Sequence, residues 1–124
     1  MSRLEEIIAA GTPVRDKRNW IKCVDGFKMS VIANWGAYCT PRPAFPSIPT
    51  MSGHEVEADY PGPFTAVEVG YPSQCPEPWE DWAEFCESPE SPTETVYGYV
   101  PVGMVRALVA LHGGEVGSAD TPED

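Results

Sequence analysis

The sequence predicts an α+β fold: a single small domain with a mostly antiparallel sheet, an N-terminal β-hairpin and about three helices. Two β-prone runs flank the dipeptide Asp25-Gly26, which is typical of tight hairpin turns. Further β-prone runs alternate with helical patterns in the second half of the chain. The 124 residues are enough for one domain with a hydrophobic core, which we place at residues 1–114.

The first predicted element is a short helix over Leu4–Ala10, which a glycine and a proline end. Ser2 is suited to the N-cap position, and Glu5 follows three residues later, as in a capping box. The hairpin comes next, within residues 19–35, which read NWIKCVDGFKMSVIANW. Its Asp-Gly dipeptide predicts a type I′ turn.

Residues 40–63 carry six prolines, which exclude a helix and disfavour a central strand. A long loop of this kind inside a small domain is usually functional or disordered. The run PFTAVEVGY that follows predicts a strand. Because side chains alternate along a strand, we expect one buried face with Thr65, Val67, Val69 and Tyr71.

The last third of the chain predicts a helix, a strand and a second helix. Pro78 suits the first position of a helix that runs to about Glu87. A strand over residues 95–100 precedes Pro101, which can open a last, largely apolar helix in the core. Residues 115–124 are expected to form an acidic disordered tail. The predicted core contains Val67, Val69, Trp79, Trp82, Val105, Leu108 and Leu111.

The charge of the chain is strongly negative and unevenly spread. Nineteen acids and eight bases give a net charge of −11. Seven of the bases and only four acids precede Pro43, whereas eleven acids and no Lys or Arg lie between Pro43 and Val105. Nucleic acids and anionic membrane surfaces are bound through Lys and Arg, so both are disfavoured as direct partners. We also expect no signal peptide and no membrane span, because the apolar runs are short.

The segment 76–94, PEPWEDWAEFCESPESPTE, combines seven acids with two tryptophans. The tryptophans share one helical stripe that favours burial in the core, and the acids fall largely outside it. Such acids can simply keep a protein soluble, or they can complement a basic surface and speed encounter with it. Phe85 lies off the stripe and is a candidate anchor. The predicted partner-binding residues are Glu77, Glu80, Asp81, Glu84, Phe85 and Glu87.

No motif in the sequence predicts catalysis. The run H-E-x-E-x-D that begins at His54 offers oxygen ligands, but its spacing does not match a calcium loop. Cys39 and His54 are a conceivable nucleophile and base without local support, and His112 suits a helix end. The four cysteines have neither zinc nor disulfide spacing, which indicates reduced thiols. We therefore expect a protein that is not an enzyme, with no cofactor and no metal.

Three stretches, GPFTAVEVGYPS, PEPWEDWAEF and TVYGYVPVGMVRALVALHGG, resemble segments of uncharacterised small acidic proteins encoded by phages of actinobacteria. The stretch IIAAGTPVRD resembles the same group, and the likeness spans most of residues 7–114. The resemblance implies a phage-encoded protein made in the bacterial cytoplasm. It brings no catalytic or binding residue with it.

Small acidic phage proteins often act by occupying a host protein. Together with the charge distribution, this makes a non-enzymatic inhibitor of a host factor the leading hypothesis, with a nucleic-acid-handling or CRISPR-type defence factor as a suitable target. One alternative is a virion accessory or assembly protein that uses the hairpin edge and the Pro-rich loop for contacts. The other is a small metal-dependent enzyme around His54. The oligomeric state is not predicted.

Overall fold

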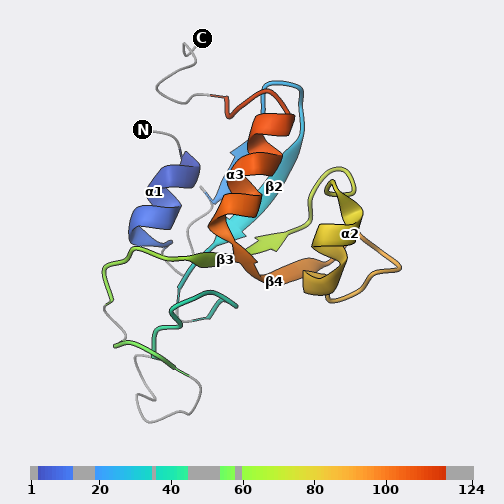
Figure 1. Cartoon of the computed structure of the whole chain (residues 1–124). Coiled ribbons are helices and arrows are strands. Elements are labelled where there is room, and N and C mark those ends of the chain that lie inside the picture. Colours follow the sequence, from blue (N-terminus) through green and yellow to red (C-terminus); the bar gives the residue numbers. More distant parts are fainter. Residues whose placement is uncertain (1–2, 13–18, 35, 45–53, 58–59, 117–124) are drawn as a thin grey trace.

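The computed structural model describes residues 3–12, 19–34, 36–44, 54–57 and 60–116. Helices and strands alternate along the chain in the way that the sequence predicts for an α+β domain (Figure 1). The elements are α1 (Arg3–Ala10), β1 (Trp20–Lys22), β2 (Lys28–Ile32), β3 (Ala66–Gly70), α2 (Trp79–Trp82), the 3-10 helix η1 (Ala83–Phe85), β4 (Val96–Pro101) and α3 (Val102–Leu111).

The four strands form one antiparallel sheet in the order β1-β2-β3-β4. The register places Val31 opposite Val69 and Val69 opposite Tyr97, so these side chains share one face of the sheet. That face is the centre of the hydrophobic core. Its buried members are Ile21, Met29, Val31, Val67, Val69, Tyr97 and Val100.

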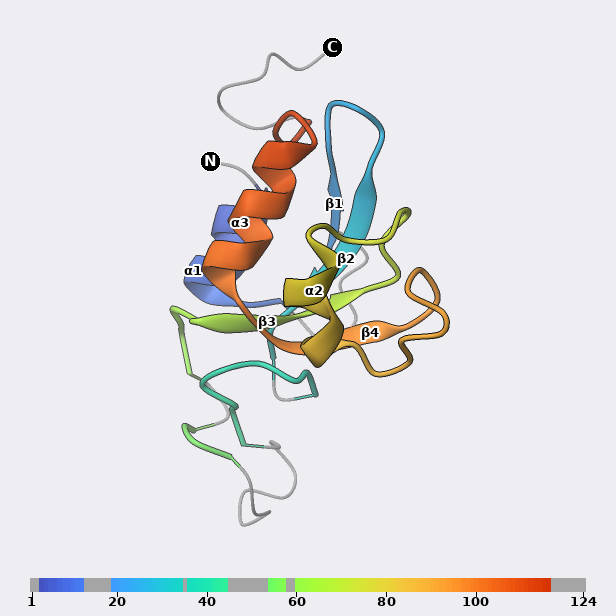
Figure 2. The same ribbon diagram turned by 45° about the vertical axis from the view of Figure 1, so that its right-hand side comes forward.

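Helices α1 and α3 lie side by side and pack on this face of the sheet (Figures 1 and 2). Each contributes three buried apolar side chains at helical spacing, which is the stripe expected of a helix with one buried side. Arg106 of α3 joins the two helices across their exposed side. Its guanidinium donates two hydrogen bonds of 2.9 Å to the Glu5 carboxylate of α1.

The β1–β2 hairpin is confirmed, but its turn is not the type I′ turn that Asp25-Gly26 predicts. The Cys23 N–H donates to the Phe27 carbonyl at 2.7 Å, which leaves a loop of three residues between the strands. Within the loop, Gly26 has a φ of +97°, while Val24 and Asp25 keep negative φ. A type I′ turn needs positive φ at two positions, so this is the three-residue loop closed by a left-handed glycine.

Two expectations about burial are wrong. Leu111 is 57% exposed, because at about 3.6 residues per turn it falls outside the stripe that Val105, Leu108 and Val109 share. In β3, Val67 and Val69 are buried as expected, and Ala66 is buried as well because both faces of the strand are covered. The expected inward-facing Thr65 and Tyr71 lie beyond the strand ends and are exposed.

The segment after α3 is folded as far as it is described, contrary to the expected tail over residues 115–124. We call residues 112–116 the C-terminal clasp. The Val116 N–H donates to the Lys22 carbonyl, and the Val24 N–H donates to the Gly114 carbonyl, so the clasp pairs with the hairpin end of β1. Residues 117–124 lie outside the described part of the chain.

Glu115, within the clasp, is only 7% exposed and caps α1 from the far end of the chain. Its carboxylate accepts the N–H groups of Arg3 and Leu4 at 2.8 and 3.1 Å. The first N–H groups of a helix have no partner inside the helix, and a carboxylate there also faces the positive end of the helix dipole. Ser2, the N-cap that the sequence predicts, lies outside the described residues.

His112 fastens the other end of the clasp to the hairpin loop. Its ring stacks on Phe27, with centroids 4.0 Å apart and planes 5° apart, and its Nδ1 lies 2.7 Å from Asp25 Oδ2. The pKa of the Asp25 carboxyl is lowered, first by the Phe27 N–H and then by His112. The helix-end role expected of His112 therefore includes a specific partner.

The described parts of the Pro-rich loop, 40–44, 54–57 and 60–63, contain no named helix or strand, as the prolines predict. One isolated bridge, between Thr40 and Ala66, ties the loop to β3, and a second, between Pro43 and Val56, joins two parts of the loop to each other. The segments 45–53 and 58–59 lie outside the described residues.

Replacing Leu108 by Ala should lower the free energy of unfolding by roughly 2–5 kcal/mol, because Leu108 is 1% exposed and a cavity would remain. Leu111→Ala, in the same helix, is the matched control and should change it by less than about 0.5 kcal/mol. Urea unfolding of both variants measures the difference. Equal losses would mean that α3 does not pack as described.

Replacing Glu115 by Ala should lower the free energy of unfolding by about 1–2 kcal/mol, because two helix N–H groups lose their acceptor. Glu94→Ala removes an exposed carboxylate and serves as the control. Hydrogen exchange at the Leu4 amide should accelerate in the first variant only. Unchanged stability and exchange in Glu115→Ala would show that the cap is dispensable.

Candidate functional site

The acidic segment after β3 is held to the domain by its tryptophans. Trp82 is 1% exposed, and its ring meets the Tyr97 ring edge-on with centroids 5.6 Å apart. Trp79 approaches the same tyrosine at 6.4 Å and is half-buried. The predicted aromatic stripe is therefore the part of this segment that packs against the core.

The helix in this segment is shorter than the predicted span from Pro78 to Glu87. One α-helical turn, α2, is followed by the 3-10 turn η1, which ends at Phe85. Cys86 then pairs with Tyr97, and the Glu87 N–H donates to the Val96 carbonyl. The chain stops being helical because these groups pair with the edge of β4. We call residues 77–87 the acidic arm.

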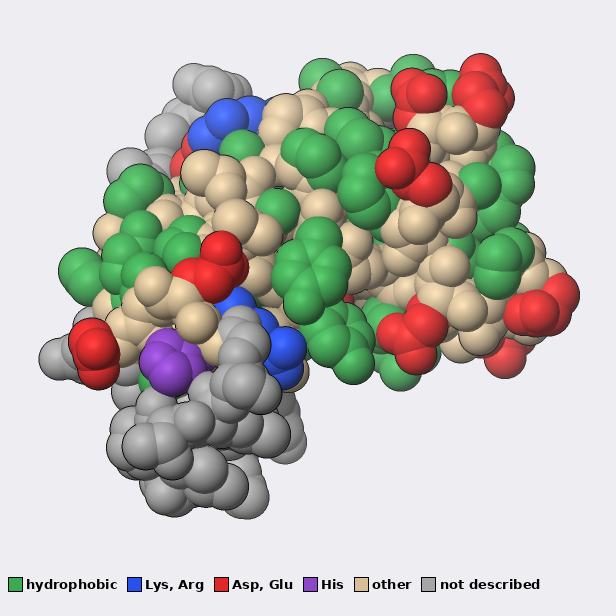
Figure 3. Space-filling model, turned by 60° about the horizontal axis from the view of Figure 1, so that its bottom comes forward, with side chains coloured by type: hydrophobic (Ala, Val, Ile, Leu, Met, Phe, Trp, Pro, Cys, Tyr) green, Lys and Arg blue, Asp and Glu red, His purple; other side chains and the backbone are tan. Residues whose placement is uncertain are grey.

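The acidic arm displays its carboxylates outward. The predicted partner-binding acids Glu77, Glu80, Asp81, Glu84 and Glu87 are all exposed, while Phe85 is half-buried and packs against the core cluster. Figure 3 shows a face of the molecule on which acidic side chains gather at one end, beside exposed hydrophobic side chains. The Lys and Arg side chains on that face lie apart from this end.

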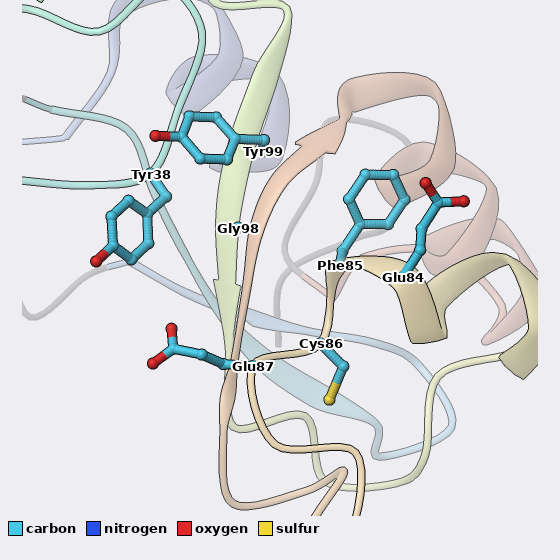
Figure 4. A pocket seen from close by; sticks show the side chains of 7 residues that line it. All are labelled: Tyr38, Glu84, Phe85, Cys86, Glu87, Gly98 and Tyr99. Atoms are coloured by element: carbon cyan, nitrogen blue, oxygen red, sulfur yellow. The ribbon is translucent and has the colours of Figure 1, made fainter. Parts of the chain in front are cut away.

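A groove runs between the acidic arm and the loop that follows β2 (Figure 4). It encloses about 580 Å³ and is open to solvent. We call it the aromatic–acidic groove. Its lining residues are Tyr38, Glu84, Phe85, Cys86, Glu87, Gly98 and Tyr99. Three of the six predicted partner-binding residues thus meet here, and Glu77, Glu80 and Asp81 lie outside it.

The floor of the groove is an irregularity in β4. Gly98 and Tyr99 together lie opposite the single residue Glu68, because Tyr97 pairs with Val69 and Val100 pairs with Val67. Tyr99 has a φ of +56°, and its N–H donates to the Tyr38 carbonyl at 2.9 Å. This bond joins the loop after β2 to the sheet.

At Gly98 the Tyr38 side chain approaches the backbone of β4 closely. A Cβ at position 98 would lie 3.1 Å from the Tyr38 Cβ. The rings of Tyr38 and Tyr99 consequently come within 5.7 Å of each other, and both are exposed. The groove therefore presents two tyrosine rings on one side and Phe85 with Glu84 on the other (Figure 4).

Glu68 adds a third carboxylate beneath the loop. It accepts the Tyr38 N–H at 2.9 Å. Its pKa is raised because burial disfavours the charged form; the Tyr38 N–H opposes this effect and the charge of Glu87 adds to it. A cation also lies on the aromatic side: the guanidinium carbon of Arg42 is 5.7 Å from the centre of the Tyr38 ring.

Sequence reasoning found the acidic side of this groove but missed Tyr38, Gly98 and Tyr99. A usable signal was present in VYGYV, where a glycine inside a β-prone run marks a bulge or a close approach of backbone. Tyr38 lies in an irregular loop, and no local pattern predicts that it lies beside β4.

The other residues that the sequence singles out for chemistry differ in exposure. Cys39 is fully buried, and burial raises the pKa of its thiol to about 11, so it is protonated at neutral pH. His54 is exposed in the Pro-rich loop, and Asp59 of the same run lies outside the described residues. Within the described ranges no group of three or more His, Cys, Asp and Glu side chains is placed to hold a metal ion. All four cysteines are unpaired.

Comparison with protein families, with curated proteins and with solved structures found no match to this chain. In the part of the chain that the structure describes, the helices are too short or too polar to cross a membrane. The groove and the acidic arm are therefore the features from which a function is argued.

Glu68→Gln should stabilise the fold at neutral pH, because glutamine keeps the acceptor for the Tyr38 N–H and removes a half-buried charge. The pKa of the Glu68 carboxyl is raised in the folded state, so its ionisation lowers the folding stability. This loss is absent below the ordinary pKa of 4.5 and complete above the raised value. The melting temperatures of variant and wild type should therefore coincide near pH 4 and diverge by pH 7. A less stable variant at pH 7 would contradict this account of Glu68.

Proposed function

We propose that this chain is a non-enzymatic phage protein that binds and inhibits a host protein through the acidic arm and the groove beside it. The proposed partner has a basic surface, such as that of a nucleic-acid-handling or CRISPR-type defence factor in the bacterial cytoplasm. The likeness to small acidic proteins of actinobacterial phages supports a phage origin. The charge distribution supports a partner with a basic surface.

The observation that carries the proposal is that the exposed acids lie on a segment anchored to the core. Five exposed carboxylates occupy an eleven-residue arm whose two tryptophans pack against Tyr97. Because the arm is anchored, its charge is held in one orientation before a partner arrives. Complementary charge fixed in this way steers encounter and orientation more than it adds affinity.

The alternative of a virion assembly protein gains less from the structure. It uses the edge of the hairpin and the Pro-rich loop for contacts, and the hairpin edge is paired with the clasp at its turn end. The five carboxylates of the acidic arm, in contrast, are all exposed. The inhibitor hypothesis therefore remains the one that the described surface supports best.

The test reverses two charges of the acidic arm and measures the rate of association with the partner. The partner is first isolated from an actinobacterial lysate with the wild-type protein as bait. Glu80→Lys/Glu84→Lys should then slow association about tenfold or more at low salt, and the effect should shrink with salt as screening shortens the field. The fold should survive, since exposed charges contribute little to stability.

Glu6→Lys/Glu57→Lys is the matched control, with the same change in net charge on α1 and the Pro-rich loop, away from the arm (Figure 1). It should slow association much less. Equal slowing by both variants would reduce the arm to one part of a general negative charge. Association that neither the reversal nor salt changes would refute the proposed role of the arm.

A further inference from the structure

The aromatic–acidic groove has the composition of a site for a flat organic cation. Three rings, those of Tyr38, Phe85 and Tyr99, line it together with the carboxylates of Glu84 and Glu87 (Figure 4). None of its described lining residues is a Lys or Arg. Aromatic faces attract cations, and nearby carboxylates add direct charge pairing.

Two carboxylates at the groove, Glu87 in its lining and Glu68 beneath the loop after β2, repel each other. The raised pKa of Glu68 arises first from burial and also from the negative charge of Glu87, so these two carboxylates repel. A cation bound in the groove would relieve that repulsion. The described surroundings thus favour a positively charged occupant over a neutral one.

Tyr99 is held in a backbone conformation that tyrosine rarely adopts. Its φ of +56° lies in the left-handed region, where a non-glycine side chain is strained, and its ring is nevertheless 44% exposed. Burial of the ring therefore does little to offset the strain.

The shape of the cation is indicated by the molecule itself. The guanidinium of Arg42 already packs over the Tyr38 ring, 5.7 Å from its centre. A guanidinium is planar, stacks on aromatic rings and donates in a fork that matches a carboxylate, whereas an ammonium is a compact, strongly hydrated charge. Three rings beside two carboxylates therefore suit a guanidinium better than an ammonium.

The geometry points to the aromatic–acidic groove as the binding site for an arginine side chain on a basic partner protein. The inference rests on the proposed function and deepens it: the acidic arm steers the partner, and the groove holds one of its arginines between Tyr99 and Phe85. The carboxylates of Glu84 and Glu87 pair with the guanidinium.

The test uses two peptides of equal charge, (Gly-Arg)3 and (Gly-Lys)3, titrated into the full chain at low salt and followed by amide NMR. The arginine peptide should bind roughly two- to fivefold more tightly, the ratio expected for an added contact with an aromatic face at an exposed site. The largest shifts should occur at the amides of Glu87, Gly98 and Tyr99. Equal affinities, or shifts spread over the acidic arm alone, would overturn the arginine site.

A pair of matched variants separates binding from folding. Tyr99→Gly removes the ring and the backbone strain together, so it should keep the melting temperature close to that of wild type and abolish the preference for arginine. Tyr71→Gly makes the same change at another exposed tyrosine of positive φ, which does not line the groove. It should leave the preference intact.

Failure of this inference is distinguishable from failure of the proposed function. If the host partner binds with salt-dependent kinetics that the arm reversal slows, while Tyr99→Gly has no effect on either peptide, the arm is functional and the arginine site is wrong. If Tyr99→Gly instead abolishes self-association of the chain, the groove belongs to a second copy, which also overturns the proposal. If Tyr99→Gly loses the preference for the arginine peptide and Tyr71→Gly keeps it, the arginine site is supported.

Discussion

The buried carboxylate of Glu115 is the contact on which the closure of this fold depends. The helix that begins the domain and the segment that ends it meet there, since Glu115 accepts the first N–H groups of α1. The backbone on either side of Glu115 pairs with β1, and His112 packs on Phe27 in the hairpin loop. One short segment thus connects both helices of the core to the edge of the sheet. The hydrogen bonds from Arg3 and Leu4 to Glu115 close almost the whole described chain into one loop, at a cost in conformational entropy.

Strand β4 has two roles that depend on each other. On the core side, Tyr97 receives the edges of both tryptophan rings and so fixes the acidic arm. Directly after Tyr97, the bulge at Gly98 and Tyr99 directs the Tyr99 N–H toward the Tyr38 carbonyl and forms the floor of the groove. The groove is therefore bounded by elements that the same strand positions. Rigid mounting of this kind lowers the entropy that binding would otherwise cost.

Local patterns in the sequence predicted most of the fold and one side of the site. Asp25-Gly26 located the hairpin, and the spacing of Trp79 and Trp82 identified which side of the acidic arm packs inward. The clasp was not predicted because a glutamate that follows a helix-ending Gly-Gly is typical of a solvated tail. The partners of Glu115 are over a hundred residues away in the sequence. Tyr38 was missed for the same reason. Interactions between distant segments leave no periodicity, so only the folded chain reveals them.

The pairing at the two sides of the sheet limits how this protein can recognise anything. The clasp bonds to Lys22 at the end of β1 and to Val24 in the hairpin loop, and Glu87 bonds to the outer edge of β4 at Val96. A sheet edge that is already occupied offers no template on which a foreign peptide can add itself as another strand. It also resists joining the edges of other copies into aggregates. At these positions recognition is left to side chains, which distinguish the chemical identity of a partner, whereas the backbone is common to all proteins.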